Sequence, residues 1–193
     1  QYTVTYIDVV DSTSGKQLNK TTKQVNYATS VRGSELGSNT ADNTYYKGYY
    51  YVSDTSATVG VNGATVYRIF KQRMSTVSGN IIWEDWNNKN SSRPDSVTLH
   101  INGSDGKTHT FTIKGDNSKN TSANTWSYNE QVPKYDSNGN VVTYTVSQDK
   151  AICKEEGLAY KKPVVNGYDI TNSISANPSD VPVKPNISIT TYI

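Results

Sequence analysis

The sequence predicts a mostly β protein built from two domains, on three observations. Apolar and aromatic residues alternate with polar ones, as in strands with one buried face, over YTVTYIDVV, ATVYRIFK, SVTLHI, THTFTI, VVTYTVS and YDITNSI. The pair Asn-Gly, which favours tight hairpin turns, occurs four times. The 193 residues are enough for two cores, and the alternation breaks and restarts near Thr76.

Residues 1–76 are predicted to form a small α+β domain. Strands are expected over 2–10 and 64–71, with a turn at Asn62-Gly63 before the second. The stretch YATSVRGSELGS, residues 27–38, has a Thr or Ser cap near position 29 or 30, Glu35 a turn later and Gly37 as a stop. This pattern predicts one short helix among the strands.

Residues 77–174 are predicted to form an all-β domain, with turns at Asn102-Gly103, Asn138-Gly139 and Asn166-Gly167. Residues 175–193 have prolines spaced as in a stiff linker and end in alternating Ile and Thr, so we expect an added strand or a bridge to a following domain. The chain opens directly in a strand without an initiator methionine, which suggests a piece of a longer polypeptide.

Composition argues against several function classes. The net charge is +2 without a basic cluster, which disfavours nucleic-acid and anionic-membrane partners. Cys153 is the only cysteine, so an intrachain disulfide or cysteine-rich zinc site is impossible. His100 and His109 lack an acidic or sulfur partner at fixed spacing, and no nucleophile–base arrangement stands out. We therefore expect no enzyme activity, no metal and no cofactor.

Six short motifs occur in order over residues 77–173: Trp-x-Asp, Arg-Pro-Asp, Trp-x-Tyr, Pro-x-Tyr-Asp-x-Asn-Gly, Tyr-Thr-Val and Ile-Thr-Asn. In this order they resemble the collagen-adhesin B-type (CnaB) domain. The resemblance implies an Ig-like, transthyretin-like β-sandwich that serves as a stalk module in adhesins and pilins of Gram-positive bacteria. Many members join a first-strand Lys to a last-strand Asn by an isopeptide bond that a buried Glu or Asp promotes.

At the matching positions this chain has Ile81 for the Lys, Gln148 for the acid and Asn172 for the acceptor. Ile81 has no nucleophile and Gln148 has no acidic proton, so we expect no cross-link here. The nearest other lysines are Lys89, Lys107 and Lys114, which leave a displaced bond as the less favoured alternative.

Residues 2–72 resemble the mucin-binding (MucBP) repeat, which implies a β-grasp, ubiquitin-like fold. The matching residues are Val4, Tyr6 and Asp8 in the opening strand, Gly48 and Tyr49 in the middle, and Thr65, Val66 and Tyr67 in the closing strand.

The segment TYYKGYYYVSD, residues 44–54, is unusually rich in tyrosine, although the whole chain prefers Tyr (15) over Phe (2). On one continuous strand, Tyr49 and Tyr51 share one face and Tyr46 and Tyr50 share the other. In the MucBP family the tyrosine of the Gly-Tyr motif is a core residue, so the resemblance implies that Tyr49 and Tyr51 face the core and that Tyr46 and Tyr50 are more exposed. A half-buried strand is the simpler interpretation. The alternative is that Tyr46 and Tyr50 stack on sugar rings as a glycan-binding site.

Together these features predict a structural and adhesive stalk segment of a bacterial surface protein. It would be extracellular and attached to the cell wall through a part of the chain not present here. Expected partners are host mucin or another glycan, an extracellular matrix protein, and neighbouring repeats of the same chain. The alternative is a ligand-free spacer or pilin-like assembly module.

Overall fold

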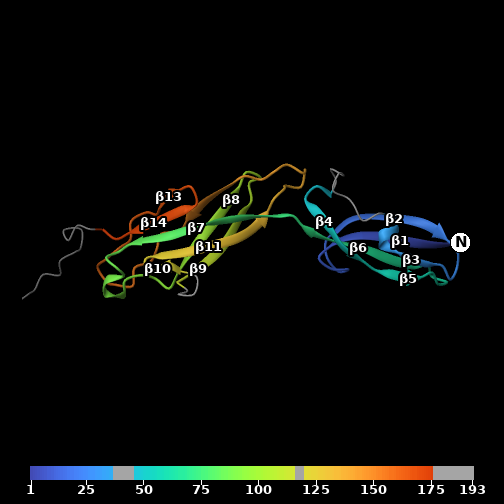
Figure 1. The fold of residues 1–193 in the computed structure, drawn as a ribbon, viewed down its shortest axis with the longest axis horizontal. Helices are drawn as coiled ribbons and strands as arrows, with labels where there is room; N and C mark the ends of the chain where they lie inside the picture. The colour runs from blue at the N-terminus through green and yellow to red at the C-terminus, as the bar shows by residue number, and fades with distance from the viewer. Residues whose placement is uncertain (37–45, 116–119, 176–193) are drawn as a thin grey trace, which may run out of the picture. The chain divides into compact units, whose positions relative to one another are not determined.

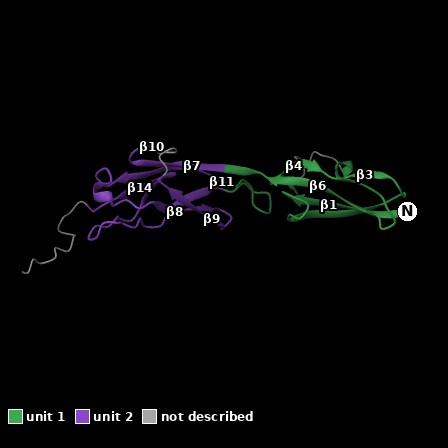
Figure 2. Ribbon diagram, turned by 90° about the horizontal axis from the view of Figure 1, so that it is seen from below, with its two compact units in different colours: residues 1–75, 131–142 green, residues 76–130, 143–193 purple. Residues whose placement is uncertain are grey.

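The computed structural model describes residues 1–36, 46–115 and 120–175. The chain divides into two compact units (Figure 2). The first unit comprises residues 1–75 and 131–142, and the second comprises residues 76–130 and 143–193. The division near residue 75 lies beside the boundary expected at Thr76, and the first unit also includes a segment taken from the middle of the second half of the chain. The predicted linker and tail strand, from residue 176 onward, lie outside the described residues.

The first unit is built on a four-stranded mixed sheet in the order β2-β1-β6-β4 (Figure 1). Its strands are β1 (Tyr2–Val10), β2 (Gln17–Val25), β4 (Tyr49–Asp54) and β6 (Ala64–Gln72). The two central strands, β1 and β6, run parallel, and each pairs with its outer neighbour in antiparallel fashion. The strands β3 (Ser30–Arg32) and β5 (Ser56–Thr58) pair in antiparallel fashion and form a separate two-stranded sheet.

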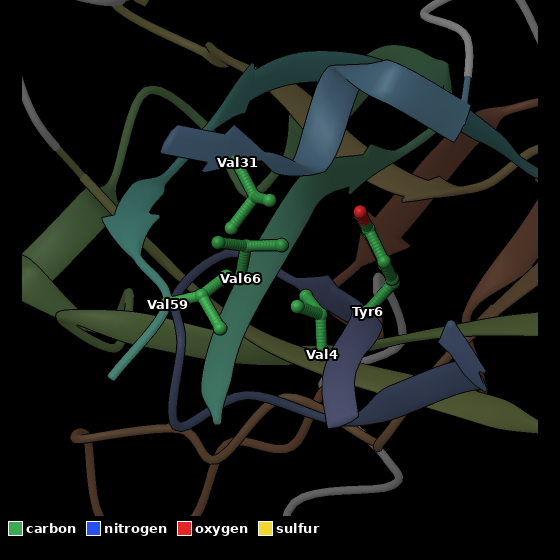
Figure 3. Close-up of a cluster of buried hydrophobic side chains, with 5 residues drawn as sticks. All are labelled: Val4, Tyr6, Val31, Val59 and Val66. Carbon is green, nitrogen blue, oxygen red and sulfur yellow. The ribbon is translucent and has the colours of Figure 1, made fainter. Parts of the chain in front are cut away.

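The core of the first unit follows from the alternation on β1 and β6. Inward positions of both strands meet side chains from β3 and from the segment after β5, and Figure 3 shows the five pointing toward one another. The cluster consists of Val4, Tyr6, Val31, Val59 and Val66, each no more than 2% exposed. Burying such side chains contributes about 1.5–3 kcal/mol for each Val, so this cluster stabilises the first unit.

The helix expected within residues 27–38 is wrong over its described part. Residues 30–32 form β3 and Gly33–Leu36 form a single 3-10 turn, η1. Val31 is buried in the core as a strand residue, and a Cβ on Gly33 would lie 2.1 Å from the Tyr67 carbonyl oxygen. Tertiary packing therefore outweighs the local cap signal. Among the described residues, no helix is long or apolar enough to cross a membrane.

The second unit is a sandwich of two sheets. One sheet has the order β10-β11-β7-β14-β13 and the other β12-β8-β9. The first contains β7 (Met74–Glu84), β10 (Asn120–Ser122), β11 (Thr125–Pro133), β13 (Val164–Asn166) and β14 (Asp169–Ser173); the second contains β8 (Ser96–Gly103), β9 (Thr108–Lys114) and β12 (Tyr144–Gln148). The strands β7 and β14 run parallel, with Asn172 opposite Trp83. A short turn, η3 (Lys89–Ser91), precedes β8.

The turn predictions hold at three of the four Asn-Gly pairs. Gly63, Gly139 and Gly167 have positive φ, with values of 79°, 78° and 62°. The prediction at Asn102-Gly103 is wrong, because both residues belong to β8 and the turn contains Gly106 at φ 80°. Asn102 stays in the strand because it bonds side chains on both neighbouring strands.

Candidate functional site

The three positions mapped to the family's cross-link lie in the interior of the second unit. Ile81 on β7 and Asn172 on β14 are completely buried, and Gln148 on β12 is 9% exposed. Gln148 Nε2 donates to Asn172 Oδ1 at 2.7 Å, and Asn172 Nδ2 donates back to Gln148 Oε1 at 3.1 Å. Because β12 and β14 belong to different sheets, this reciprocal amide pair joins the two sheets non-covalently.

The amide pair satisfies the buried polar atoms of both side chains. Gln148 Nε2 also donates to the Asp149 carbonyl oxygen at 3.1 Å, so both of its amide hydrogens have acceptors. The three lysines considered for a displaced bond, Lys89, Lys107 and Lys114, are all exposed. Two neutral amides with paired hydrogen bonds hold strands together but supply neither a nucleophile nor an acid.

A buried ion pair lies at the start of the second unit. Its two residues belong to the Trp-x-Asp and Arg-Pro-Asp motifs, which predicted the fold but not this contact. Arg93 Nε donates to Asp85 Oδ2 at 2.8 Å, and Arg93 Nη2 donates to Asp85 Oδ1 at 2.6 Å. The Tyr160 hydroxyl adds a hydrogen bond to Asp85 Oδ2 at 2.8 Å. The Arg93 guanidinium also lies 5.2 Å from the Trp83 ring centre, a cation–π arrangement. We call Asp85, Arg93 and Tyr160 the loop cluster.

The surroundings of the loop cluster set its charge state. Burial alone would raise the pKa of the Asp85 carboxyl, but donors from Arg93, the Asn88 backbone and Tyr160 outweigh burial and lower it below its usual value. The pKa of the Tyr160 hydroxyl is raised by burial and by its bond to Asp85. The cluster therefore holds one carboxylate, one guanidinium and one neutral phenol at physiological pH.

The first unit has a second buried cluster of the same three residue types. Arg68 Nε and Nη2 donate to the two oxygens of Asp8, each at 2.7 Å. The Tyr46 hydroxyl also donates to Asp8, and the Tyr46 ring stacks on Phe70 with centroids 5.2 Å apart. Burial raises the pKa of the Tyr46 hydroxyl, and its bond to Asp8 raises it further. We call Asp8, Arg68 and Tyr46 the strand cluster.

The expected exposure of Tyr46 is therefore wrong: it is 4% exposed and belongs to the core. The strand begins only at Tyr49, after a turn through Lys47 and Gly48, so the alternation counted from Tyr49 does not extend back to Tyr46. Tyr51 turns inward as expected and meets Phe70 edge-on.

Tyr50 is 42% exposed and lies beside a cation. The Arg73 guanidinium is 5.9 Å from the Tyr50 ring centre. Within the same unit, the ammonium groups of Lys47 and Lys134 lie 5.4 and 5.7 Å from the ring centre of Tyr135. We call these five residues the tyrosine–cation patch.

Side chains that could bind a metal do not gather in the described ranges. No group of three or more His, Cys, Asp or Glu side chains that could hold a metal ion occurs there. His100 Nε2 lies 2.9 Å from Asp149 Oδ1, and its Nδ1 lies 3.1 Å from the Thr110 hydroxyl. This histidine therefore belongs to a surface hydrogen-bond chain.

Comparison with known proteins places the second unit in a family. The model of the Cna protein B-type domain matches residues 77–173. The collagen adhesin of Staphylococcus aureus is 24% identical over 157 residues, which is 81% of this chain and 12% of that protein's length.

Among solved structures, two B repeat units of the S. aureus collagen-binding protein share 24% identity and a TM-score of 0.40, covering 66% of this chain and 30% of that one. A type 2 repeat of the mucus-binding protein MUB from Lactobacillus reuteri shares 10% identity and a TM-score of 0.29, covering 92% and 100%. The Trp-x-Asp, Arg-Pro-Asp and Ile-Thr-Asn motifs supply Asp85, Arg93 and Asn172 to the loop cluster and the amide pair, and they lie within the span matched by the family model. This chain belongs to the Cna protein B-type domain family.

Proposed function

We propose that this chain is a structural and adhesive segment of a bacterial cell-surface protein, located outside the cell and attached to the wall through another part of the polypeptide. The family match over residues 77–173 carries the proposal, because the related S. aureus protein is named a collagen adhesin. The domains would be residues 1–76 and 77–174, with 175–193 as a linker and tail strand; residues 131–142, which fall in the second of these ranges, belong to the first compact unit. Buried clusters that tie sheets and loops together suit a module that must stay folded under load.

For residues 2–72 we propose a MucBP-like β-grasp module. The opening strand β1 pairs in parallel with the closing strand β6, and β2 and β4 flank them. The Asp8 of the opening motif lies opposite Arg68, directly after the closing Thr65-Val66-Tyr67 motif. The motif residues therefore support the same packing that the proposed fold requires.

The second module would be stabilised without a covalent cross-link. The amide pair occupies Asn172, and the alternative lysines are exposed, which supports this proposal. Mass spectrometry of the intact chain should give the mass calculated from the sequence. A deficit of one ammonia that disappears in the Asn172→Ala variant would show that a bond to Asn172 exists after all.

For adhesion, we propose that the tyrosine–cation patch contributes to weak binding of a host mucin or other glycan. Tyr50 presents an exposed aromatic face for a sugar ring, while Arg73 supplies hydrogen-bond donors beside it. Tyr46 would support this site only indirectly, through the core. Tethered copies of a weak site raise the effective concentration, so repeats of the chain would bind more strongly than one.

The test compares mucin and glycan-array binding of the whole chain with two variants. Tyr50→Ala should lose most of the binding, whereas Tyr27→Ala, which removes another exposed tyrosine of the same unit, should retain it. Equal absence of binding by all three proteins would favour the ligand-free spacer or pilin-like assembly module. Loss of binding in both variants would place the site elsewhere in the unit.

A further inference from the structure

The tip of the β13–β14 hairpin exposes an Asn-Gly pair in open surroundings. Asn166 is the last residue of β13 and is exposed, and Gly167 follows it with φ 62°. A Cβ built on Gly167 would meet no atom within 4 Å. Asn166 lies opposite Asp169, the first residue of β14. The Asn166 side chain and the Gly167 backbone are therefore both open to solvent.

Asn-Gly pairs undergo a spontaneous reaction that depends on this accessibility. The backbone nitrogen of the glycine attacks Cγ of the asparagine, the N–Cγ bond forms, and the Cγ–Nδ2 bond breaks with loss of ammonia. Water then opens the resulting five-membered imide at one of its two carbonyls, which gives aspartate or isoaspartate. Glycine permits the attack because it has no side chain to block the approach or restrict its backbone.

The attacking nitrogen reacts most readily when its N–H is not held in a hydrogen bond, and this requirement distinguishes the four pairs. Gly63 N donates to the Gly60 carbonyl oxygen at 2.9 Å, Gly103 N to Lys107 O at 2.8 Å, and Gly139 N to Asp136 O at 3.1 Å. The Gly167 N–H and the Asn166 side-chain amide make no hydrogen bond to any described residue. Only at this hairpin tip does the reaction begin without breaking a turn hydrogen bond.

We propose that Asn166 is the preferred site of deamidation in the folded chain. The product has a carboxylate opposite Asp169, and like charges directly opposite each other destabilise a strand pair. Isoaspartate also adds a carbon to the backbone, which shifts the pairing of β13 with β14. Since β13 is the edge strand and its only neighbour in the sheet, β14, carries Asn172, the modification loosens the sheet edge next to the amide pair as the protein ages.

Trypsin separates the four sites, so one experiment compares them. Each Asn-Gly pair falls in its own peptide: residues 48–68, 90–107, 135–150 and 162–193. The folded chain is incubated at mildly alkaline pH in water enriched in heavy oxygen, and conversion is followed by peptide mass spectrometry. Asn166 should convert at least about fivefold faster than the other three, the factor expected when they must first break a hydrogen bond of about 1 kcal/mol.

The denatured chain is the matched control, because all four glycine nitrogens are then free. Rates in denaturant should become similar, and the lead of Asn166 should disappear. The Asn166→Gln variant should lose the signal in peptide 162–193 and leave the other three rates unchanged. Equal or faster conversion at Asn62, Asn102 or Asn138 in the folded chain would overturn the proposal, as would a lead of Asn166 that persists in denaturant.

Discussion

The strand cluster and the loop cluster use the same three side chains to solve different structural problems. Asp8 and Arg68 are 60 residues apart and lie opposite each other on the parallel strands β1 and β6. Asp85 and Arg93 are eight residues apart and flank an irregular loop. In each cluster a tyrosine hydroxyl donates to the carboxylate, and the guanidinium lies over an aromatic ring. The first ion pair thus ties a sheet together, and the second shapes a loop.

The loop closed by Asp85 and Arg93 contains five non-glycine residues with left-handed φ between 54° and 58°: Trp86, Asn87, Asn88, Asn90 and Ser91. Each costs roughly 1–2 kcal/mol in this conformation, less for asparagine. The ion pair offsets this strain, since Arg93 also binds the Ala123 carbonyl and the Asn124 side chain across the loop. Removing Arg68 should therefore destabilise the sheet of the first unit, whereas removing Arg93 should destabilise the loop of the second unit.

The largest effect is expected for Arg68→Met. Asp8 would remain buried, at 2% exposed, and would lose both hydrogen bonds from Arg68 while keeping the one from the Tyr46 hydroxyl. Breaking a buried ion pair in this way typically costs about 3–5 kcal/mol. Hydrogen exchange of β1 and β6 should therefore accelerate strongly. All three tryptophans lie in the second unit, so the tryptophan fluorescence transition in urea should stay unchanged; a shift of that transition would show that the units unfold together.

Arg93→Met should destabilise the second unit by about 3 kcal/mol, the low end of the range for broken buried pairs. The reduced loss reflects the donors left to Asp85, which are the Tyr160 hydroxyl and the Asn88 backbone N–H. Here the tryptophan transition should move to lower urea, while exchange in β1 and β6 stays unchanged. If Arg93→Met lowered the free energy of unfolding by no more than a surface substitution does, the loop would not depend on the ion pair.

A smaller effect is expected at the neutral amide pair. Asn172→Ala leaves the buried Gln148 amide without its partner, which should cost about 1–3 kcal/mol. The double variant Gln148→Met with Asn172→Leu removes both partners and keeps the volume, so it should recover most of that loss. Urea titration followed by tryptophan fluorescence measures both. A double variant less stable than the single one would mean that the amide pair stabilises the sandwich beyond satisfying its own atoms.

The sequence predicted the strands well because their signal is local. Alternation located β1, β6, β8, β9 and β14 almost to the residue, and Asn-Gly located three turns. The helix at 27–38 was mispredicted because Val31 and Gly33 are fixed by contacts with distant strands, which no local cap signal reports. Tyr46 was misassigned because the phase of a strand holds only from its first residue onward.

The buried clusters were partly visible in the sequence. Asp8 and Arg68 occupy the inward phase of strands whose other inward residues are apolar, and a charge at such a position indicates a buried partner. Their pairing with each other was not predictable, since it depends on the parallel register of β1 and β6. Gln148 and Asn172 were located from the sequence because the family motif fixed both positions at once, and the structure shows that their amides pair with each other.

The smallest effect is expected from acid. The folded-state pKa of Asp85 is lowered from the usual value near 3.8, so the unfolded chain binds this proton more readily than the folded one. Its contribution to stability is complete above about pH 4 and is lost as the pH falls toward the folded-state pKa, by up to about 1.4 kcal/mol per pH unit. Asp85→Asn should remove this part of the slope from tryptophan-monitored urea transitions, whereas Asp8→Asn should leave it in place because the tryptophans do not report on the first unit. An equal slope in the wild type and in Asp85→Asn would mean that other carboxyls control the acid sensitivity of the sandwich.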